Sequence, residues 1–387
     1  MVSLKKGEKM NGFIFYNPVK IVFGNGKINS LASDAIQIGK KCLIVIGQKS
    51  VKKSGIFDKC INNLNKVSVS YVLLENIQPN PRIEKVYEGI EMAKKNSVDF
   101  ILAIGGGSVI DTAKAIAAGF YYEGDAWDFY IMRSEIKKAL PIMVILTVAA
   151  TGSEMNSISV IQNDSVRQKN SAQGYPLFPK VSILDPELTK TLSKDYTAYA
   201  SVDIISHVLE GYFTSEDENT PLQDGFTESI VKTVIQETYK LMLNPLNIES
   251  RSNIMWASSL ALSGFTTAGI GRFKFENHLI EHALSAYYDI PHGAGLSIVI
   301  PAWMKENREK MKRKFEKFAK NIFNSKTADE GILRIESFFK DINAPTSLSH
   351  YKITNIKELT DNIIECAPTR GLNLTRDYIE RIFERCK

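Results

Sequence analysis

Histidine is scarce in this chain of 387 residues, and most of it lies in one region. Four of the five histidines fall between positions 207 and 292. Asp203 and His207 are four residues apart, as are His278 and His282, and side chains at that spacing share one face of a helix. His292 follows in a Pro-His-Gly sequence. A carboxylate and two or three imidazoles from separate helices would form a transition-metal site, and such ligands suit Fe(II), Zn, Co or Ni.

Three glycines follow a short apolar run and precede a predicted helix. Gly105, Gly106 and Gly107 come directly after residues 100–104, and Ser108 follows them. Glycines at this point let the backbone turn tightly and approach a ligand, and N–H groups at the helix start can face an anion. The spacing matches neither the GxGxxG fingerprint nor the Walker A loop. We expect a phosphate-binding loop here, the alternative being a plain tight turn.

Two further apolar runs end in small polar residues. Residues 42–46 lead into Gly-Gln-Lys-Ser at 47–50, and residues 142–146 lead into Thr147 and the Thr-Gly-Ser sequence at 151–153. Ligands of open α/β sheets bind outside the carboxyl ends of the strands. The three loops therefore predict a crevice at that edge of a sheet, and a nucleotide is its simplest occupant.

The elements that must position these groups change in character along the chain. Apolar β-branched runs alternate with amphipathic stretches over residues 1–186, which predicts an α/β dinucleotide-binding domain with a parallel sheet. Residues 187–387 show almost only helical patterns and predict an all-helical metal- and substrate-binding domain. The predicted strands span residues 42–46, 69–74, 100–104, 142–146 and 181–184. The predicted helices span residues 83–95, 110–118, 189–214, 224–243, 250–268, 275–288, 327–339 and 374–385.

Composition excludes several classes of protein. The chain is 44% apolar and 24% charged, which is ordinary for a globular protein and excludes a disordered chain or a disulfide scaffold. The longest apolar stretch, residues 139–150, is short of the roughly 18 residues that a membrane-spanning helix needs. The net charge of +5 is spread along the chain, so we expect no nucleic-acid partner. The four cysteines have no metal-ligand spacing and no signal peptide precedes them, so we expect a cytoplasmic protein.

Taken in order, these motifs resemble the iron-containing (group III) alcohol dehydrogenases. The resemblance is carried by the glycine loop with Asp111 and Lys114, by the sequence at 151–154 and by the spaced aspartate and histidines, and it extends along essentially the whole chain. The sequences at 54–55 and 280–295 resemble the butanol dehydrogenase branch. The resemblance implies the two-domain architecture shared with dehydroquinate synthase, a cleft holding NAD(P) and a divalent metal, and a homodimer.

The resemblance also assigns roles to residues. It implies that Asp203, His207, His278 and His292 hold the metal, with Fe(II) favoured and Zn the alternative. It places His282 close by, as the residue for substrate binding or proton transfer. The positions that it assigns to the dinucleotide are Gly47, Gln48, Lys49, Ser50, Gly105, Gly106, Gly107, Ser108, Asp111, Thr147, Thr151, Ser153 and Lys169.

The loop at 47–50 bears on the choice between NADP and NAD. It carries no carboxylate that would bind a ribose 2′-OH or repel a 2′-phosphate. Lys49, Lys52 and Lys53 could attract that phosphate, so the loop favours NADP. These lysines could equally form a solvated helix start, which leaves NAD open.

The expected reaction is hydride transfer between nicotinamide C4 and a small, butanol-like primary alcohol or its aldehyde. Two alternatives belong to other classes. A metal-dependent lyase or cyclase of the dehydroquinate synthase type would need a basic pocket, and the segment beside the histidines offers only Arg272 and Lys274. A non-catalytic nucleotide-binding protein would keep the metal site as a relic.

Overall fold

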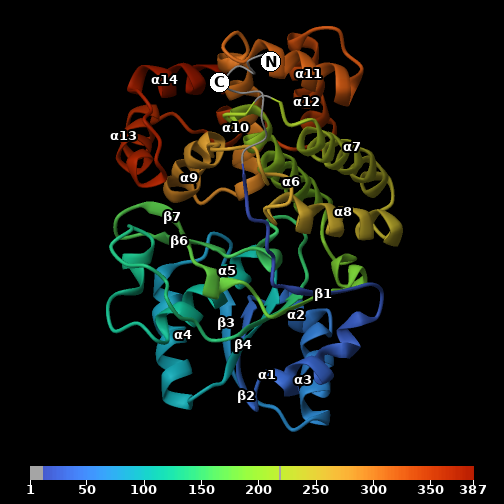
Figure 1. Ribbon diagram of the computed structural model, residues 1–387, viewed down its shortest axis with the longest axis vertical. Helices are drawn as coiled ribbons and strands as arrows, with labels where there is room; N and C mark the ends of the chain where they lie inside the picture. Colours follow the sequence, from blue (N-terminus) through green and yellow to red (C-terminus); the bar gives the residue numbers. More distant parts are fainter. Residues whose placement is uncertain (1–11, 218) are drawn as a thin grey trace, which may run out of the picture. The chain divides into compact units, whose positions relative to one another are not determined.

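The computed structural model describes residues 12–217 and 219–387, and the chain forms two compact units (Figure 1). The sheet unit contains residues 17–192 together with residues 246–255. Of the described residues, the helical unit contains 12–16, 193–217, 219–245 and 256–387. The predicted domain boundary after residue 186 stays a prediction. None of the helices formed by the described residues is both long and apolar enough to cross a membrane.

A six-stranded parallel sheet organises the sheet unit. Its strands lie in the order β1-β8-β5-β4-β2-β3, so β4 lies between β2 and β5. Every neighbouring pair is parallel, as runs that are apolar at each position predict. The strands are β1 Lys20–Phe23, β2 Lys41–Gly47, β3 Ser70–Ile77, β4 Phe100–Gly105, β5 Ile142–Leu146 and β8 Val181–Leu184.

Helices cover both faces of this sheet. Alternate strand residues such as Val45 and Ala103 pack with α4 and α5 in one buried cluster. Their neighbours, such as Ile44 and Leu102, pack with α1 and α3 in another, so successive side chains point to opposite faces. Figure 1 shows α4 on one side of the strands and α1 and α3 on the other. The helices are α1 Leu31–Ile38, α2 Ser50–Lys53, α3 Ile56–Lys66, α4 Ile83–Asn96 and α5 Gly107–Gly119.

A two-stranded antiparallel hairpin in the sheet unit was not predicted. It pairs β6, Ile158–Asn163, with β7, Gln168–Gln173. The second strand reads QKNSAQ and has almost no apolar residues, so it lacks the alternation that signals a strand. Short 3-10 helices occupy several connections: η1 Lys27–Ser30, η2 Ala126–Phe129, η3 Ser153–Met155, η4 Tyr175–Leu177, η5 Pro186–Thr189, η6 Leu348–Tyr351 and η7 Ala367–Arg370.

The helical unit packs around a buried central helix, α6. Helices α7 and α10 both lie against α6, and α9 lies against α10. Phe213 of α6 stacks on Phe315 of α11, with ring centroids 4.4 Å apart, and contacts Trp303 of α10. The helices of this unit are α6 Lys194–Thr214, α7 Pro221–Leu243, α9 Glu276–Tyr288, α10 His292–Asn307, α11 Lys312–Phe323, α12 Ala328–Asp341, α13 Ile356–Cys366 and α14 Arg376–Arg385. Helix α8, Ile248–Ala261, begins within residues 246–255 of the sheet unit and ends in the helical unit.

Two predicted helix boundaries are wrong for local reasons. The helix predicted from residue 189 begins at Lys194, because Ser193 caps it by accepting a hydrogen bond from the Tyr196 N–H. The helix predicted to reach residue 268 ends at Ala261, and Gly264 soon follows with a φ of +84°.

Candidate functional site

Helix α6 carries two of the predicted metal ligands. Asp203 and His207 are one turn apart, and both side chains are buried. Residues 200–213 of this helix are all buried, so its polar side chains must be satisfied by groups from neighbouring helices or by a ligand.

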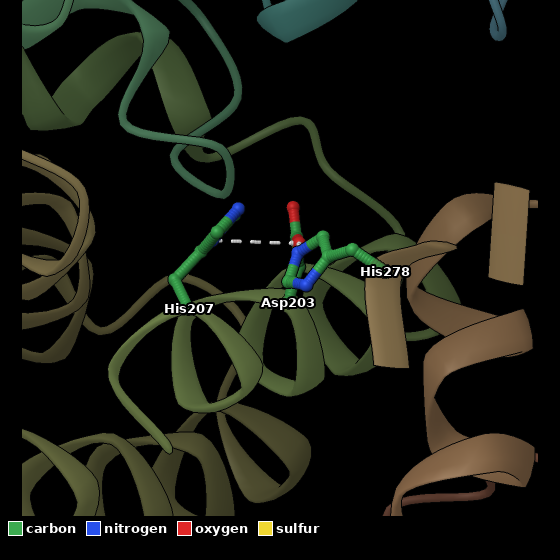
Figure 2. Close-up of side chains that lie close together, drawn as sticks. All are labelled: Asp203, His207 and His278. Atoms are coloured by element: carbon green, nitrogen blue, oxygen red, sulfur yellow. Dashed lines mark ion pairs between the residues drawn. The ribbon is translucent and has the colours of Figure 1, made fainter. Parts of the chain in front are cut away.

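Three imidazoles converge on one oxygen atom. Asp203 Oδ1 lies 3.5 Å from His207 Nδ1, 3.9 Å from His278 Nε2 and 3.6 Å from His292 Nε2. Figure 2 shows His278 reaching from α9 toward the two residues of α6. Within the part of the chain that the structure describes, this buried oxygen accepts no hydrogen bond. His292 completes the set as the first residue of α10, with Pro291 at the N-cap, where the sequence indicated only a turn.

This donor set fits a divalent metal ion. Tetrahedral ligands held 2.0–2.2 Å from an ion lie about 3.4 Å from one another, close to the separations around Asp203 Oδ1. Ligand atoms of Asp203, His207 and His278 all lie within 4.8 Å of one another. Burial lowers the pKa of His207 to about 3, although the nearby Asp203 carboxylate opposes this. Neutral imidazole is the form that binds metals.

Two buried glutamates contact the outer nitrogens of these imidazoles. Glu210 of α6 is hydrogen-bonded to His278 Nδ1 at 3.0 Å, and Glu281 of α9 pairs with His292 Nδ1. Burial raises the pKa of Glu210 to about 8, and a bound cation would lower it again. The sequence analysis missed both residues. Their signal was the spacing, since each follows a predicted ligand on its own helix by three residues.

The predicted proton-transfer residue lies beside this cluster. His282 is one turn after His278 on α9, and its side chain is buried. Its ring centroid lies 5.7 Å from that of His292. Ligand-type atoms of Glu281, His282 and His292 lie within 4.8 Å of one another. The structure thus brings together all five residues that the sequence singled out in this half of the chain.

The predicted dinucleotide loops follow three adjacent strands in the sheet unit. Residues 47–50 and 105–108 begin at the last residues of β2 and β4, and residues 147–153 follow the carboxyl end of β5. The loops after β4 and β5 are joined by a hydrogen bond of 3.0 Å from the Thr147 N–H to the Gly105 carbonyl. The parallel arrangement therefore places all three loops at one edge of the sheet.

The glycine loop leads into the N-terminus of α5. Gly106 occupies the N-cap and has no side chain to cap the first N–H groups of the helix. A Cβ atom at Gly107 would lie 2.5 Å from Thr151 Cγ2, so only glycine allows the loop after β5 to pack this closely. A helix start with open N–H groups is a suitable site for a phosphate.

Other predicted dinucleotide residues interact with the protein itself. The Asp111 carboxylate accepts hydrogen bonds from Ser153 Oγ at 2.6 Å and from the Val160 N–H at 3.1 Å. Lys169 lies on β7, and its Nζ donates to Asn80 Oδ1 at 2.9 Å. All of these side chains but that of Val160 are buried. The structure shows that Asp111 and Ser153 bind each other in this arrangement.

Comparison with known proteins identifies the family. The family description "Iron-containing alcohol dehydrogenase" matches residues 18–186, and "Fe-containing alcohol dehydrogenase family, C-terminal" matches residues 197–386. The chain belongs to the iron-containing alcohol dehydrogenase family. It is an iron-type, NAD(P)-dependent oxidoreductase of the alcohol dehydrogenase class.

Individual relatives of this iron-containing alcohol dehydrogenase cover nearly the whole chain. The probable NADH-dependent butanol dehydrogenase 1 of Bacillus subtilis is 41% identical over 94% of this chain and 95% of the relative. The NADPH-dependent aldehyde reductase YqhD of Escherichia coli is 33% identical over 98% of this chain and 100% of the relative. The solved NADH-dependent butanol dehydrogenase A of Thermotoga maritima has a TM-score of 0.95 and 38% identity, covering 97% of this chain and 99% of that one. The resemblance and the fold class predicted from the sequence are confirmed.

Proposed function

We propose that this enzyme reduces small aldehydes to primary alcohols of butanol-like size, and oxidises those alcohols in reverse, with a nicotinamide cofactor. The observation that carries the proposal is the convergence of Asp203, His207, His278 and His292 around one carboxylate oxygen. The relatives support the substrate class, since they are named butanol dehydrogenases and an aldehyde reductase. A relic site would have no need of a complete ligand set.

In this proposal Asp203, His207, His278 and His292 hold the metal. When bound, a divalent metal supplies a Lewis acid that polarises the substrate oxygen and lowers the pKa of the alcohol. His282 is buried beside these ligands and exchanges the hydroxyl proton, because imidazole is the side chain that gains and loses protons near neutral pH. Asp203, His207, His278 and His282 are buried, and this burial limits the access of water to the reacting oxygen.

The dinucleotide is assigned to the loops of the sheet unit. The N–H groups of Gly106, Gly107 and Ser108 bind the pyrophosphate at the start of α5. Thr147, Thr151, Ser153 and Lys169 serve the nicotinamide side, with Asp111 holding Ser153 in place. Residues 47–50 receive the adenosine end. The cofactor, when bound, supplies the hydride, and the protein supplies its orientation.

The choice of cofactor depends on the loop after β2. Lys52 forms an ion pair with Glu75 of β3, whereas none of the ion pairs among the described residues involves Lys49. Lys49 is exposed directly after β2 and is suited to attract a 2′-phosphate, which supports NADPH. Four relatives with 40–44% identity are named NADH-dependent. The ratio of kcat/KM for NADPH and NADH therefore tests this part of the proposal.

The decisive experiment is an aldehyde-reduction assay on metal-stripped enzyme with Fe(II) or Zn added back. We expect activity to be lost on stripping and restored by one of the metals. The H207A and H278A variants should lose both bound metal and turnover, whereas H282A should keep its metal and lose turnover. An H207A variant that retained metal and full activity would contradict the ligand assignment. Stoichiometric metal without turnover on any aldehyde would contradict the proposed reaction.

We also propose that the enzyme is a homodimer, as the family resemblance implies. An apolar segment near the start of the described chain supports this, since Ile14 is 96% exposed and Tyr16 64% exposed. Isolated chains rarely leave such residues in water beside one another. Light scattering coupled to size-exclusion chromatography should give twice the chain mass of 43.3 kDa, and a value near 43 kDa would contradict the proposal.

A further inference from the structure

Glu210 performs two tasks at the start of α9. Its carboxylate accepts hydrogen bonds from the His278 N–H at 3.0 Å and from Asn277 Nδ2 at 3.2 Å, in addition to the bond from His278 Nδ1. The N-cap of α9 is Phe275, whose side chain cannot accept a hydrogen bond. A carboxylate from α6 therefore takes the place of the missing cap and fixes the helix turn that carries His278.

Glu281 fixes the other imidazole from a different direction. Its side chain is fully buried, with one carboxylate oxygen bonded by the Ser285 hydroxyl and the other paired with His292 Nδ1. Since Ser285 is one turn further along α9, the carboxylate is oriented by its own helix while it contacts the first residue of α10. His292 therefore has a fixed ring orientation as well as a fixed backbone.

Both contacts have the same chemical consequence. A bound cation favours the ionised form of both carboxylates, and an ionised carboxylate can only accept hydrogen bonds, so the Nδ1 atoms of His278 and His292 then carry the protons. The lone pairs are then left on the Nε2 atoms, which are the atoms that lie 3.9 Å and 3.6 Å from Asp203 Oδ1. A charged acceptor also makes the imidazole a better donor to a metal.

We propose that Glu210 and Glu281 are positioning residues of the metal site, which fix the ring orientation and tautomer of His278 and His292 and thereby set the affinity for the ion. The inference rests on the proposed function, since it needs these histidines to be metal ligands. Neither glutamate is assigned to bind the ion or the substrate.

The test compares two buried glutamates that contact a proposed metal-binding histidine with one buried glutamate that contacts none. The variants are E210Q and E281Q, with E228Q as the matched control. Glu228 is also buried in the helical unit and also accepts two hydrogen bonds, from Tyr212 OH at 2.9 Å and Asn321 Nδ2 at 2.8 Å. Glutamine preserves the volume of the side chain and removes the charge.

The readout is metal binding by the full-length, metal-stripped protein, without alcohol or cofactor. Competition with a chelator gives the dissociation constant for Co(II), and the visible absorption of bound Co(II) reports the ligand geometry. We expect E210Q and E281Q to bind Co(II) roughly 10- to 100-fold more weakly than wild type and to change its spectrum. E228Q should match wild type in both. Thermal unfolding of the metal-free proteins identifies any variant that fails to fold.

The outcomes separate this inference from the proposed function. Wild-type affinity and spectrum in both E210Q and E281Q would overturn the inference. An equal loss of affinity in E228Q would also overturn it, because a general loss of packing would then explain the effect. If E210Q does not fold, E281Q alone decides by the same criteria. A wild-type protein that binds no Co(II) would instead overturn the metal site on which the proposed function depends.

Discussion

Replacing Lys114 by methionine is expected to destabilise the sheet unit strongly. This lysine lies on α5 with its side chain completely buried. Its three N–H groups are shared among five oxygen atoms that lie 2.7–3.0 Å from Nζ in the segment after β5: the carbonyl and hydroxyl of Ser153, the carbonyl and side-chain oxygen of Asn156, and the carbonyl of Ile158. One side chain thus joins α5 to a segment about forty residues further along the chain.

The magnitude follows from what the substitution leaves behind. Methionine fills most of the volume and donates nothing, so the three N–H donors that these oxygen atoms share are lost. The buried Asp111 carboxylate also loses the cation that lowers its pKa, against the raising effect of burial. Removing one partner of a buried charged pair costs about 3–5 kcal/mol. At about 2–4 °C per kcal/mol for a unit of this size, the melting temperature should fall by about 6–20 °C.

Thermal and urea unfolding followed by circular dichroism would measure the effect, with K52M as the matched control. Lys52 also pairs with a carboxylate, that of Glu75, but both side chains are about 40% exposed. Exposed pairs contribute at most about 1 kcal/mol, so K52M should unfold close to wild type. A K114M variant that unfolds within 1 kcal/mol of wild type would refute the reasoning, as would an equal loss in K52M.

Three further predictions concern other groups. G293A should lose metal, because a Cβ there would lie 2.6 Å from the Tyr199 carbonyl carbon and would force the start of α10 at least about 0.8 Å away from α6, whereas the positions of metal ligands tolerate shifts of only about 0.2 Å. The control G225A has open space around its Cβ and should keep its metal. Equal metal content in the two variants would contradict this prediction. K49Q should lower the ratio of kcat/KM for NADPH to kcat/KM for NADH by roughly 10-fold, because it removes one charged contact to the 2′-phosphate. An unchanged ratio would show that Lys49 does not contribute to the choice of cofactor. Burial lowers the pKa of Lys114 from 10.5 to about 8. Between pH 8 and 10.5 the native chain has therefore lost a proton that the unfolded chain still holds. The contribution of this group to the free energy of unfolding consequently rises with pH over that range. The difference in unfolding free energy between wild type and K114M should therefore grow by about 1.6 kcal/mol from pH 8 to 9.5, and a flat difference in urea unfolding would contradict it.

Local patterns in the sequence were sufficient for the main strands and for the residues around the proposed metal. Residues 101–104 are apolar at every position because both faces of β4 are covered, and this burial is visible in the sequence itself. The four-residue spacing of Asp203 and His207 depends only on helix geometry, so it predicted a shared face before any packing was known. The glycine loop was equally visible, because its position between strand and helix is a local property.

Other features depended on partners that are distant in the sequence. The strand β7 has polar side chains, so its hydrogen bonding to β6 left no periodic signal. The family resemblance assigned Asp111 and Ser153 to the cofactor, and only the folded chain shows that they bond each other. Residues 246–255 join the sheet unit although they lie between segments of the helical unit. No local pattern encodes such associations.

The sequence by itself determined which side chains were available for metal and phosphate chemistry and on which helices and loops they lie. Tertiary structure alone decided which nitrogen of His278 and of His292 faces Asp203, because Glu210 comes from α6 and Glu281 contacts the start of α10. Helix spacing fixes the direction of a Cβ atom and leaves the ring orientation open. That orientation is set by a hydrogen-bond partner brought close by the packing of three helices.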